Sequence, residues 1–223
     1  FGYGLETYLT TLLQFFNYRL DAFILNWFST SAVVGIYSVA VSLAETIWHL
    51  CNAVASLVFP KISALTREEA NRLTPITSRF TLTASFLAAI LLAVIGPWAI
   101  TTLYGKAFGA AIYPLWFLLP GIVFFGLVKI LYGDLAGRGF PGIGGWVTGT
   151  ALILTLLFDF TFIPLWQASG AAVASSISYT AAAVLCTYYF AKITGISHRE
   201  VWILKGTDVK RVFRKVYNRN EEI

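Results

Sequence analysis

Charged residues are scarce in this sequence. Asp, Glu, Lys and Arg make up only 12% of its 223 residues, whereas 57% of the residues are hydrophobic. Soluble domains carry about twice that charged fraction, so the composition argues against a soluble enzyme or binding module. Several apolar runs reach the roughly 20 residues that a helix needs to cross a bilayer core. The sequence therefore predicts an all-α, polytopic membrane protein.

Cysteine, histidine and methionine are scarce as well: the sequence has two cysteines, two histidines and no methionine. Cys51 and Cys186 lie in apolar runs without metal-ligand spacing, so we expect two small core residues rather than a disulfide or a metal site. No nucleophile motif or soluble pair of acids occurs, and we expect neither a cofactor nor catalysis. Without an initiator methionine or a signal peptide, the chain is expected to be a piece of a longer protein.

Hydropathy and turn residues divide the chain into six predicted spans. The connections after the first, third and fifth spans are short, and the one after the second, residues 60–79, is longer and charged. The sequence after the fourth span permits a helical continuation to about Arg138. The six spans are predicted at Leu5–Phe28, Ala32–Phe59, Phe80–Tyr104, Ile112–Tyr132, Trp146–Trp166 and Ala171–Lys192.

The cations lie almost entirely on one side of the predicted membrane, and Lys106 alone falls on the other side. Because cytoplasmic loops carry the excess of Lys and Arg, the connections after the second and fourth spans and both termini are predicted to be cytoplasmic. Trp27, Trp98, Trp116 and Trp166 lie at the opposite ends of their spans, as an interfacial aromatic belt requires. The cations assigned to the cytoplasm are Lys61, Arg67, Arg72, Arg79, Arg138, Lys192, Arg199, Lys205, Lys210, Arg211, Arg214, Lys215 and Arg219.

The chain is expected to consist of a transmembrane lobe, residues 1–192, and a basic cytoplasmic tail, residues 193–223. Within the tail, residues 207–220 place apolar side chains on one helical face and cations on the opposite face. This pattern is typical of a basic amphipathic helix that lies on the inner leaflet. A solvated tail that helps to set the topology explains the same residues equally well.

The second predicted span carries a polar stripe. A charged side chain at mid-bilayer costs roughly 2.5–3.5 kcal/mol on insertion scales, so such a stripe must face protein or a water-filled cavity. Glu45 and His49 lie one turn apart and could pair or share a proton. The members of the stripe recur at spacings of four and three residues, which keeps them on one helical face: Ser38, Ser42, Glu45, His49, Asn52 and Ser56.

The first predicted span also has polar residues at mid-membrane depth. Gln14 and Asp21 lie on one face, with Asn17 and Arg19 beside it. Residues two apart point about 200° apart on a helix, so Arg19 and Asp21 cannot pair with each other and each needs a partner elsewhere. Interhelical hydrogen bonding explains serines without a transport role. The ionisable groups exceed that need, and the first two spans are therefore predicted to line a hydrophilic cavity.

Two further charges, Lys129 in the fourth span and Asp159 in the fifth, are also predicted to lie within the membrane. Lys129 is close enough to the cytoplasmic end to extend its ammonium group toward the interface. Asp134 and Arg138 have the i, i+4 spacing of an ordinary ion pair.

Four segments of the chain resemble one superfamily of membrane transporters. They are FFNYRLDAFIL, LVFPKIS, LLPGIVFFGLVKILYGDLAGRGFP and IPLWQASGAAVASSISY. All four resemble the C-terminal half of polysaccharide-exporting proteins of the multidrug/oligosaccharidyl-lipid/polysaccharide exporter superfamily, and the resemblance extends from Gly4 to about Lys192. It implies a two-lobed, inverted-V transporter of about 12–14 helices in the cell (inner) membrane of a bacterium or archaeon, with this chain as the second lobe.

The resemblance also implies an activity, namely flipping of a polyprenyl-pyrophosphate-linked oligosaccharide from the cytoplasmic to the outer leaflet by alternating access. The cargo would be an O-antigen, capsule or exopolysaccharide unit, and the partners would be membrane lipids and the N-terminal lobe, without nucleic acid. On this hypothesis Arg19 binds the diphosphate, and Glu45, His49 and Asp21 exchange protons. Asp159 stands where the family leads us to expect Asn. The candidate cavity residues are Gln14, Asn17, Arg19, Asp21, Ser42, Glu45, His49 and Asn52, with Lys129 and Asp159 as further candidates.

Alternative functions fit the residues less well. A cation-coupled multidrug antiporter of the same superfamily would use Asp21, Glu45 and Asp159, but Arg19 opposes a cationic drug nearby. A lipid II flippase is a related alternative. A membrane glycosyltransferase or polymerase would carry a large catalytic loop, and no predicted loop exceeds about twenty residues. A purely structural subunit would not need ionisable stripes at mid-membrane.

Overall fold

The computed structural model describes residues 2–203, and every regular element within them is helical, which confirms the all-α prediction. The amphipathic helix predicted within residues 207–220 lies outside the described residues. The elements are α1 (Gly2–Phe28), α2 (Ser31–Ala64), α3 (Arg67–Leu103), the 3₁₀ helix η1 (Lys106–Ala111), α4 (Ile112–Gly137), α5 (Gly142–Thr194) and α6 (Arg199–Trp202).

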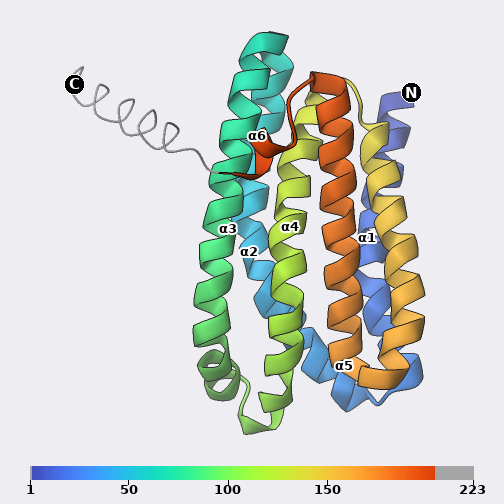
Figure 1. Ribbon diagram of the computed structural model, residues 1–223. Coiled ribbons are helices and arrows are strands. Elements are labelled where there is room, and N and C mark those ends of the chain that lie inside the picture. Colours follow the sequence, from blue (N-terminus) through green and yellow to red (C-terminus); the bar gives the residue numbers. More distant parts are fainter. Residues whose placement is uncertain (1, 204–223) are drawn as a thin grey trace, which may run out of the picture.

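The long helices run up and down in one bundle with α4 at its centre (Figure 1). Helix α4 contacts α2, α3 and α5, while α1 contacts α5 extensively. Leu115, Phe125, Ile130 and Leu131 of α4 are fully buried. Because α4 is apolar on nearly every side, it fills the interior, and the helices with polar faces surround it. Cys51 and Cys186 are buried free thiols, as their apolar surroundings predicted.

Helix α5 is two antiparallel arms joined by a sharp bend (Figure 1). The backbone is non-helical at Gln167, which has φ 48° and ψ −124°. The bend brings the arms so close that a Cβ on Gly170 would lie 2.2 Å from the carbonyl oxygen of Phe162. The arms correspond to the fifth and sixth predicted spans, and the predicted QASG connection is reduced to this one bend.

Four of the described helical segments are long and apolar enough to cross a membrane: Ser31–Ala64, Arg67–Leu103, Lys106–Gly137 and Gly142–Thr194. Since the last of these contains both arms of α5, it covers two predicted spans. Helix α1 has 27 residues but is not among the four, and it carries Arg19 and Asp21, which lower its hydropathy. The number of six spans therefore stays a prediction.

The connection between α2 and α3 differs from the predicted loop at residues 60–79. Helix α2 passes through Pro60 to Ala64, and α3 begins at Arg67. Thr66 and Glu69 form a capping box, in which the Glu69 amide donates to Thr66 Oγ1 at 3.4 Å and the Thr66 amide donates to Glu69 Oε2 at 3.0 Å. This T-x-x-E pattern is a strong helix-start signal, and it places the turn at residues 65–66 despite the surrounding charge.

The described part of the predicted tail packs against the bundle. Helix α6 contacts α3, where the buried Arg79 donates to the Glu200 carbonyl oxygen and lies 3.5 Å from its carboxylate. Val201 is fully buried, and the rings of Trp202 and Phe124 lie 5.5 Å apart. Residues 199–202 therefore form part of the lobe surface.

Candidate functional site: an open polar face and a buried carboxylate cluster

The polar stripe of α2 faces away from the core. Ser42, His49 and Asn52 are exposed and Glu45 is half-buried, whereas Ala44 and Trp48 on the opposite face are buried. The apolar face of α2 packs on α4 because that face supplies the large hydrophobic side chains. The stripe is thus free to meet a polar partner outside this lobe.

Helix α1 divides its polar residues between two environments. Arg19 is exposed and Gln14 is half-buried, so both reach the open side of the bundle. Asn17 and Asp21 are buried, at 0% and 3% exposure, on the face that packs against α5. The structure therefore brings Gln14 and Arg19 toward the α2 stripe and places Asn17 and Asp21 in the interior.

A cavity of about 360 Å³ opens between α1, α2 and α4. Gln14 of α1 and Asn52 of α2 line it, together with Phe125, Lys129 and Tyr132 of α4. The two amides offer donors and acceptors, and the ring faces are suited to stacking on sugars or other planar apolar surfaces. We call this cavity, the adjoining stripe of α2 and the exposed Arg19 of α1 the open polar face.

Lys129 is the only cation that lines this cavity among the described residues. Its Nζ lies 4.6 Å from the ring centre of Trp48, 5.5 Å from that of Tyr18 and 5.7 Å from that of Phe125. It also donates to Tyr18 Oη at 3.4 Å. Cation–π attraction to three rings stabilises the ammonium group while its surroundings exclude much of the water.

Charges of both signs meet on the open polar face. The carboxylate of Glu45 lies within electrostatic range of Arg19, Lys129 and His49. Two basic side chains, Arg19 and Lys129, beside a single carboxylate favour a positive local balance. Such a surface attracts an anionic group and also provides a carboxylate that can exchange a proton.

Asp21 is the centre of the buried cluster. Its carboxylate accepts hydrogen bonds from the Tyr37 hydroxyl, from Ser175 Oγ at 3.2 Å and from the Ala22 amide at 2.7 Å. These donors come from α1, α2 and the second arm of α5, so the cluster ties three helices together. Within residues 2–203, no lysine or arginine forms an ion pair with Asp21.

Asn17 and Asp159 extend the cluster along α1 and the first arm of α5. Thr155 Oγ1 donates to Asn17 Oδ1 at 3.2 Å, and Asn17 Nδ2 is buried without a partner. Asp159 is fully buried, and neither of its carboxylate oxygens has a hydrogen-bond partner. Asp21 and Asp159 lie within electrostatic range of each other. Two buried carboxyl groups without an ion-pair partner among the described residues are suited to hold a proton or a small cation.

Several residues of these sites escaped the sequence analysis. Tyr37, Ser175 and Thr155 supply donors to the buried cluster, and Trp48 supplies a face to Lys129. Each resembles an ordinary apolar or small residue of a membrane helix, and no regular spacing in the sequence indicates that it belongs to a polar site. The described residues contain no group of three or more metal-ligating side chains, and the two carboxylates are the only acidic side chains of the cluster.

Residues 1–113 match the family described as "Polysaccharide biosynthesis protein", which is half of the chain. The chain belongs to the polysaccharide biosynthesis protein family. A curated relative, the probable low-salt glycan biosynthesis flippase of Haloferax volcanii, is 25% identical over 202 residues, and these cover 88% of this chain and 42% of the relative. This member of the polysaccharide biosynthesis protein family thus spans less than half the length of that relative.

Solved transporter structures share the fold of this family member. A multidrug resistance MATE family transporter of the MOP superfamily in an outward-facing conformation matches with a TM-score of 0.64 and 17% identity, over 94% of this chain and 49% of that one. A MOP superfamily transporter from Pyrococcus furiosus, described as having a binding pocket of reverse polarity, matches with a TM-score of 0.64, 18% identity and the same coverage. The lobe therefore has the fold of one half of a MOP-superfamily transporter.

Proposed function

We propose that this chain is one lobe of a membrane transporter that flips a polyprenyl-pyrophosphate-linked oligosaccharide from the cytoplasmic to the outer leaflet. The observation that carries the proposal is the open polar face, where Arg19, Glu45, His49 and Lys129 lie on a bundle whose surface otherwise exposes many large apolar side chains between its two ends. Membership of the polysaccharide biosynthesis protein family supports it. The other lobe would close over this face, and alternating access would expose it to each side in turn.

The chemistry of such a cargo suits the residues. A pyrophosphate cannot cross hydrocarbon unaided, and cations placed in a groove of low water content stabilise it. Arg19 is exposed and offers a planar donor set, while Lys129 is held ready by its three aromatic neighbours. Sugar hydroxyls would bind to Gln14, Asn52 and Ser42. Because these side chains can both donate and accept hydrogen bonds, one groove could accept an oligosaccharide in more than one arrangement.

The buried cluster supports a coupling role. A carboxylate without hydrogen-bond partners, such as Asp159, is costly to bury as an anion. Uptake of a proton or a small cation from outside would remove that cost, and its release would restore it. Because Asp21 ties α1, α2 and α5 together, occupation of the cluster would change the packing of the helices that line the open polar face.

Transport by the full-length protein in proteoliposomes tests the proposal. A fluorescent polyprenyl-pyrophosphate oligosaccharide is followed across the bilayer, with and without a proton or sodium gradient, beside efflux of a cationic dye. We expect movement of the lipid-linked sugar without dye efflux. Dye efflux alone would favour a cation-coupled drug antiporter, for which Glu45 and the buried carboxylates would form the site.

Arg19→Ala gives a sharper test of the same face. Because Arg19 is exposed and forms no ion pair within the described residues, its removal should leave membrane insertion and thermal stability unchanged. Loss of one charge-assisted phosphate contact of about 1.5–3 kcal/mol should lower flipping by about tenfold or more. Arg72→Ala is the matched control, since it removes an exposed arginine far along the chain from this face. Equal flipping by the two variants would exclude Arg19 from cargo binding.

A further inference from the structure

A second cavity, of about 400 Å³, lies at the end of the bundle where the α2–α3 and α4–α5 connections meet. Ser63 of α2, Arg67 and Asn71 of α3, Arg138 after α4 and Thr194 of α5 line it. This is the end of the lobe that the distribution of cations predicts to be cytoplasmic. Apart from the open polar face, it is the place where arginine and amide side chains from several helices face a common space.

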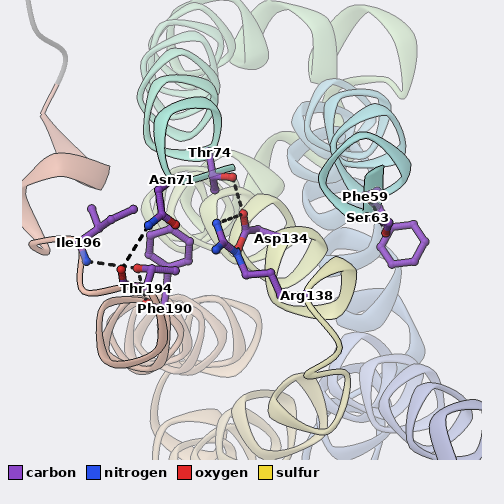
Figure 2. Close-up of polar contacts among 9 residues, drawn as sticks. All are labelled: Phe59, Ser63, Asn71, Thr74, Asp134, Arg138, Phe190, Thr194 and Ile196. Carbon is purple, nitrogen blue, oxygen red and sulfur yellow. Dashed lines mark hydrogen bonds and ion pairs between the residues drawn. The ribbon is translucent and has the colours of Figure 1, made fainter. Parts of the chain in front are cut away.

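Arg138 is fixed in this cavity by its neighbours. Its Nε and Nη2 donate to the two oxygens of Asp134 at 2.5 and 3.1 Å, which confirms the predicted i, i+4 ion pair. Thr74 Oγ1 also donates to Asp134 at 2.5 Å, as Figure 2 shows. The arginine side chain is only 11% exposed. Its Nη1 takes part in neither bond, so the guanidinium can reach a ligand without leaving its buried partner.

Arg67 adds a second cation at the rim. It is the first residue of α3, and the Thr66–Glu69 capping box fixes the backbone beside it. The Glu69 carboxylate bonds to the Thr66 amide and hydroxyl and does not line the cavity. Asp134 balances the charge of Arg138 from behind the cavity wall, and Arg67 adds a cation with no acidic side chain among the lining residues. The cavity is therefore suited to an anion.

Asn71 adds a different requirement. Its Nδ2 donates to the carbonyl oxygen of Thr194 at 3.4 Å, and its Oδ1 is buried without a partner (Figure 2). An unpaired buried acceptor needs a donor. A ligand that combines anionic oxygens with a hydrogen-bond donor, such as a hydroxyl group, would meet both requirements. The lining also includes Ile62, Leu65, Phe140 and Ile193, which suit an apolar chain beside that polar group.

We propose that this cavity binds the glycerophosphate headgroup of an anionic phospholipid of the cytoplasmic leaflet. The phosphate would lie against Arg67 and Arg138, and a glycerol hydroxyl would donate to Asn71. The apolar residues would contact the start of the acyl chains, with the exposed Phe140 at the membrane side. Such a lipid would join the ends of α2, α3, α4 and α5, next to Phe59 and Ala136, which line the cavity of the open polar face.

Native mass spectrometry of the full-length protein with added phosphatidylglycerol tests this site. We expect one tightly held phosphatidylglycerol that phosphatidylcholine does not replace. Arg67→Gln should weaken its binding about tenfold, as expected for the loss of one charge-assisted hydrogen bond. Arg72→Gln is the matched control, because Arg72 is an exposed arginine on the same helix that does not line the cavity.

Asn71→Asp provides a second variant, which places a negative charge among the lining residues, beside the position proposed for the phosphate. We expect a loss of phosphatidylglycerol at least as large as for Arg67→Gln, and circular dichroism verifies that both variants are folded. Binding of sn-glycerol 3-phosphate in competition with the lipid would assign the recognition to the glycerophosphate group itself. Retention of sn-glycerol 3-phosphate without lipid would overturn the lipid assignment. Equal losses in Arg67→Gln and Arg72→Gln would overturn the site.

Discussion

Two buried carboxylates of this lobe differ in their surroundings and should respond oppositely to the same substitution. Asp21 accepts three hydrogen bonds, whereas the oxygens of Asp159 accept none. Asp159→Asn removes an unpaired buried acid at little cost and should leave thermal stability unchanged or higher. Asp21→Asn replaces one of two acceptor oxygens by a donor, which faces either the Ala22 amide or the Tyr37 and Ser175 hydroxyls, and it should lower the free energy of unfolding by about 1–3 kcal/mol.

Thermal unfolding of the purified full-length Asp21→Asn and Asp159→Asn variants measures the difference in their stability. Gradient-driven flipping measures the role of each carboxylate in coupling. If the cluster takes up the coupling ion, Asp159→Asn should flip cargo without dependence on the gradient while remaining folded. Gradient-dependent flipping at the wild-type rate in this stable variant would show that Asp159 has no part in coupling.

The sequence predicts which residues of the two sites are polar but not how deep they lie. The helical period places Asn17 and Asp21 one turn apart, and it equally permits that face to be open or buried. The outcome depends on α5, whose Thr155 and Ser175 supply the matching donors. Such partners lie more than a hundred residues away along the chain, so spacing within one helix could not reveal them. The α2 stripe was predictable because its opposite face is continuously apolar.

At the scale of elements, the bend in α5 depends on one glycine. A Cβ at Gly170 would meet the Phe162 carbonyl oxygen at 2.2 Å, which is backbone and cannot rotate away. Gly170→Ala should therefore force the two arms apart and cost about 3 kcal/mol, near the upper end for overpacking. Gly109→Ala is the control, since no atom lies within 4 Å of a Cβ at Gly109.

The yield of folded protein and the melting temperature after purification measure this effect. A Gly170→Ala protein as stable as the Gly109→Ala control would mean that the arms separate at low cost.

The bend also shows what the sequence could predict, since Pro164 and the small residues near Gly170 indicate a chain reversal. The α2–α3 turn shows the opposite case. There the charge of residues 60–79 suggested a loop, although the capping box Thr66–Glu69 was readable and determines where α3 begins.

At the scale of the whole molecule, the open question is whether α1 crosses the membrane. Its length of 27 residues is sufficient, because a helix rises about 1.5 Å per residue. Its polar residues are divided between the open polar face and the buried cluster, so few of them need to contact lipid. Trp27 and Trp98, in the last two turns of α1 and α3, are exposed, and Figure 1 shows that these two helices end at the same end of the bundle. We therefore expect α1 to span the bilayer together with α2.

Single cysteines in the full-length protein decide the topology, because the native Cys51 and Cys186 are buried and should not react. Membrane-impermeant maleimide should label Thr30→Cys and Lys106→Cys from outside intact cells, since these positions are exposed at the end opposite the cations. Gly4→Cys and Arg72→Cys should react only once the cytoplasmic side is opened. Arg72 lies in the second turn of α3 and Lys106 lies just after its last residue, so this pair establishes that the assay resolves one crossing. If Gly4→Cys and Thr30→Cys then reacted from the same side, α1 would lie along the membrane. The open polar face would then lose Arg19 and Gln14, and with them its binding site for a pyrophosphate.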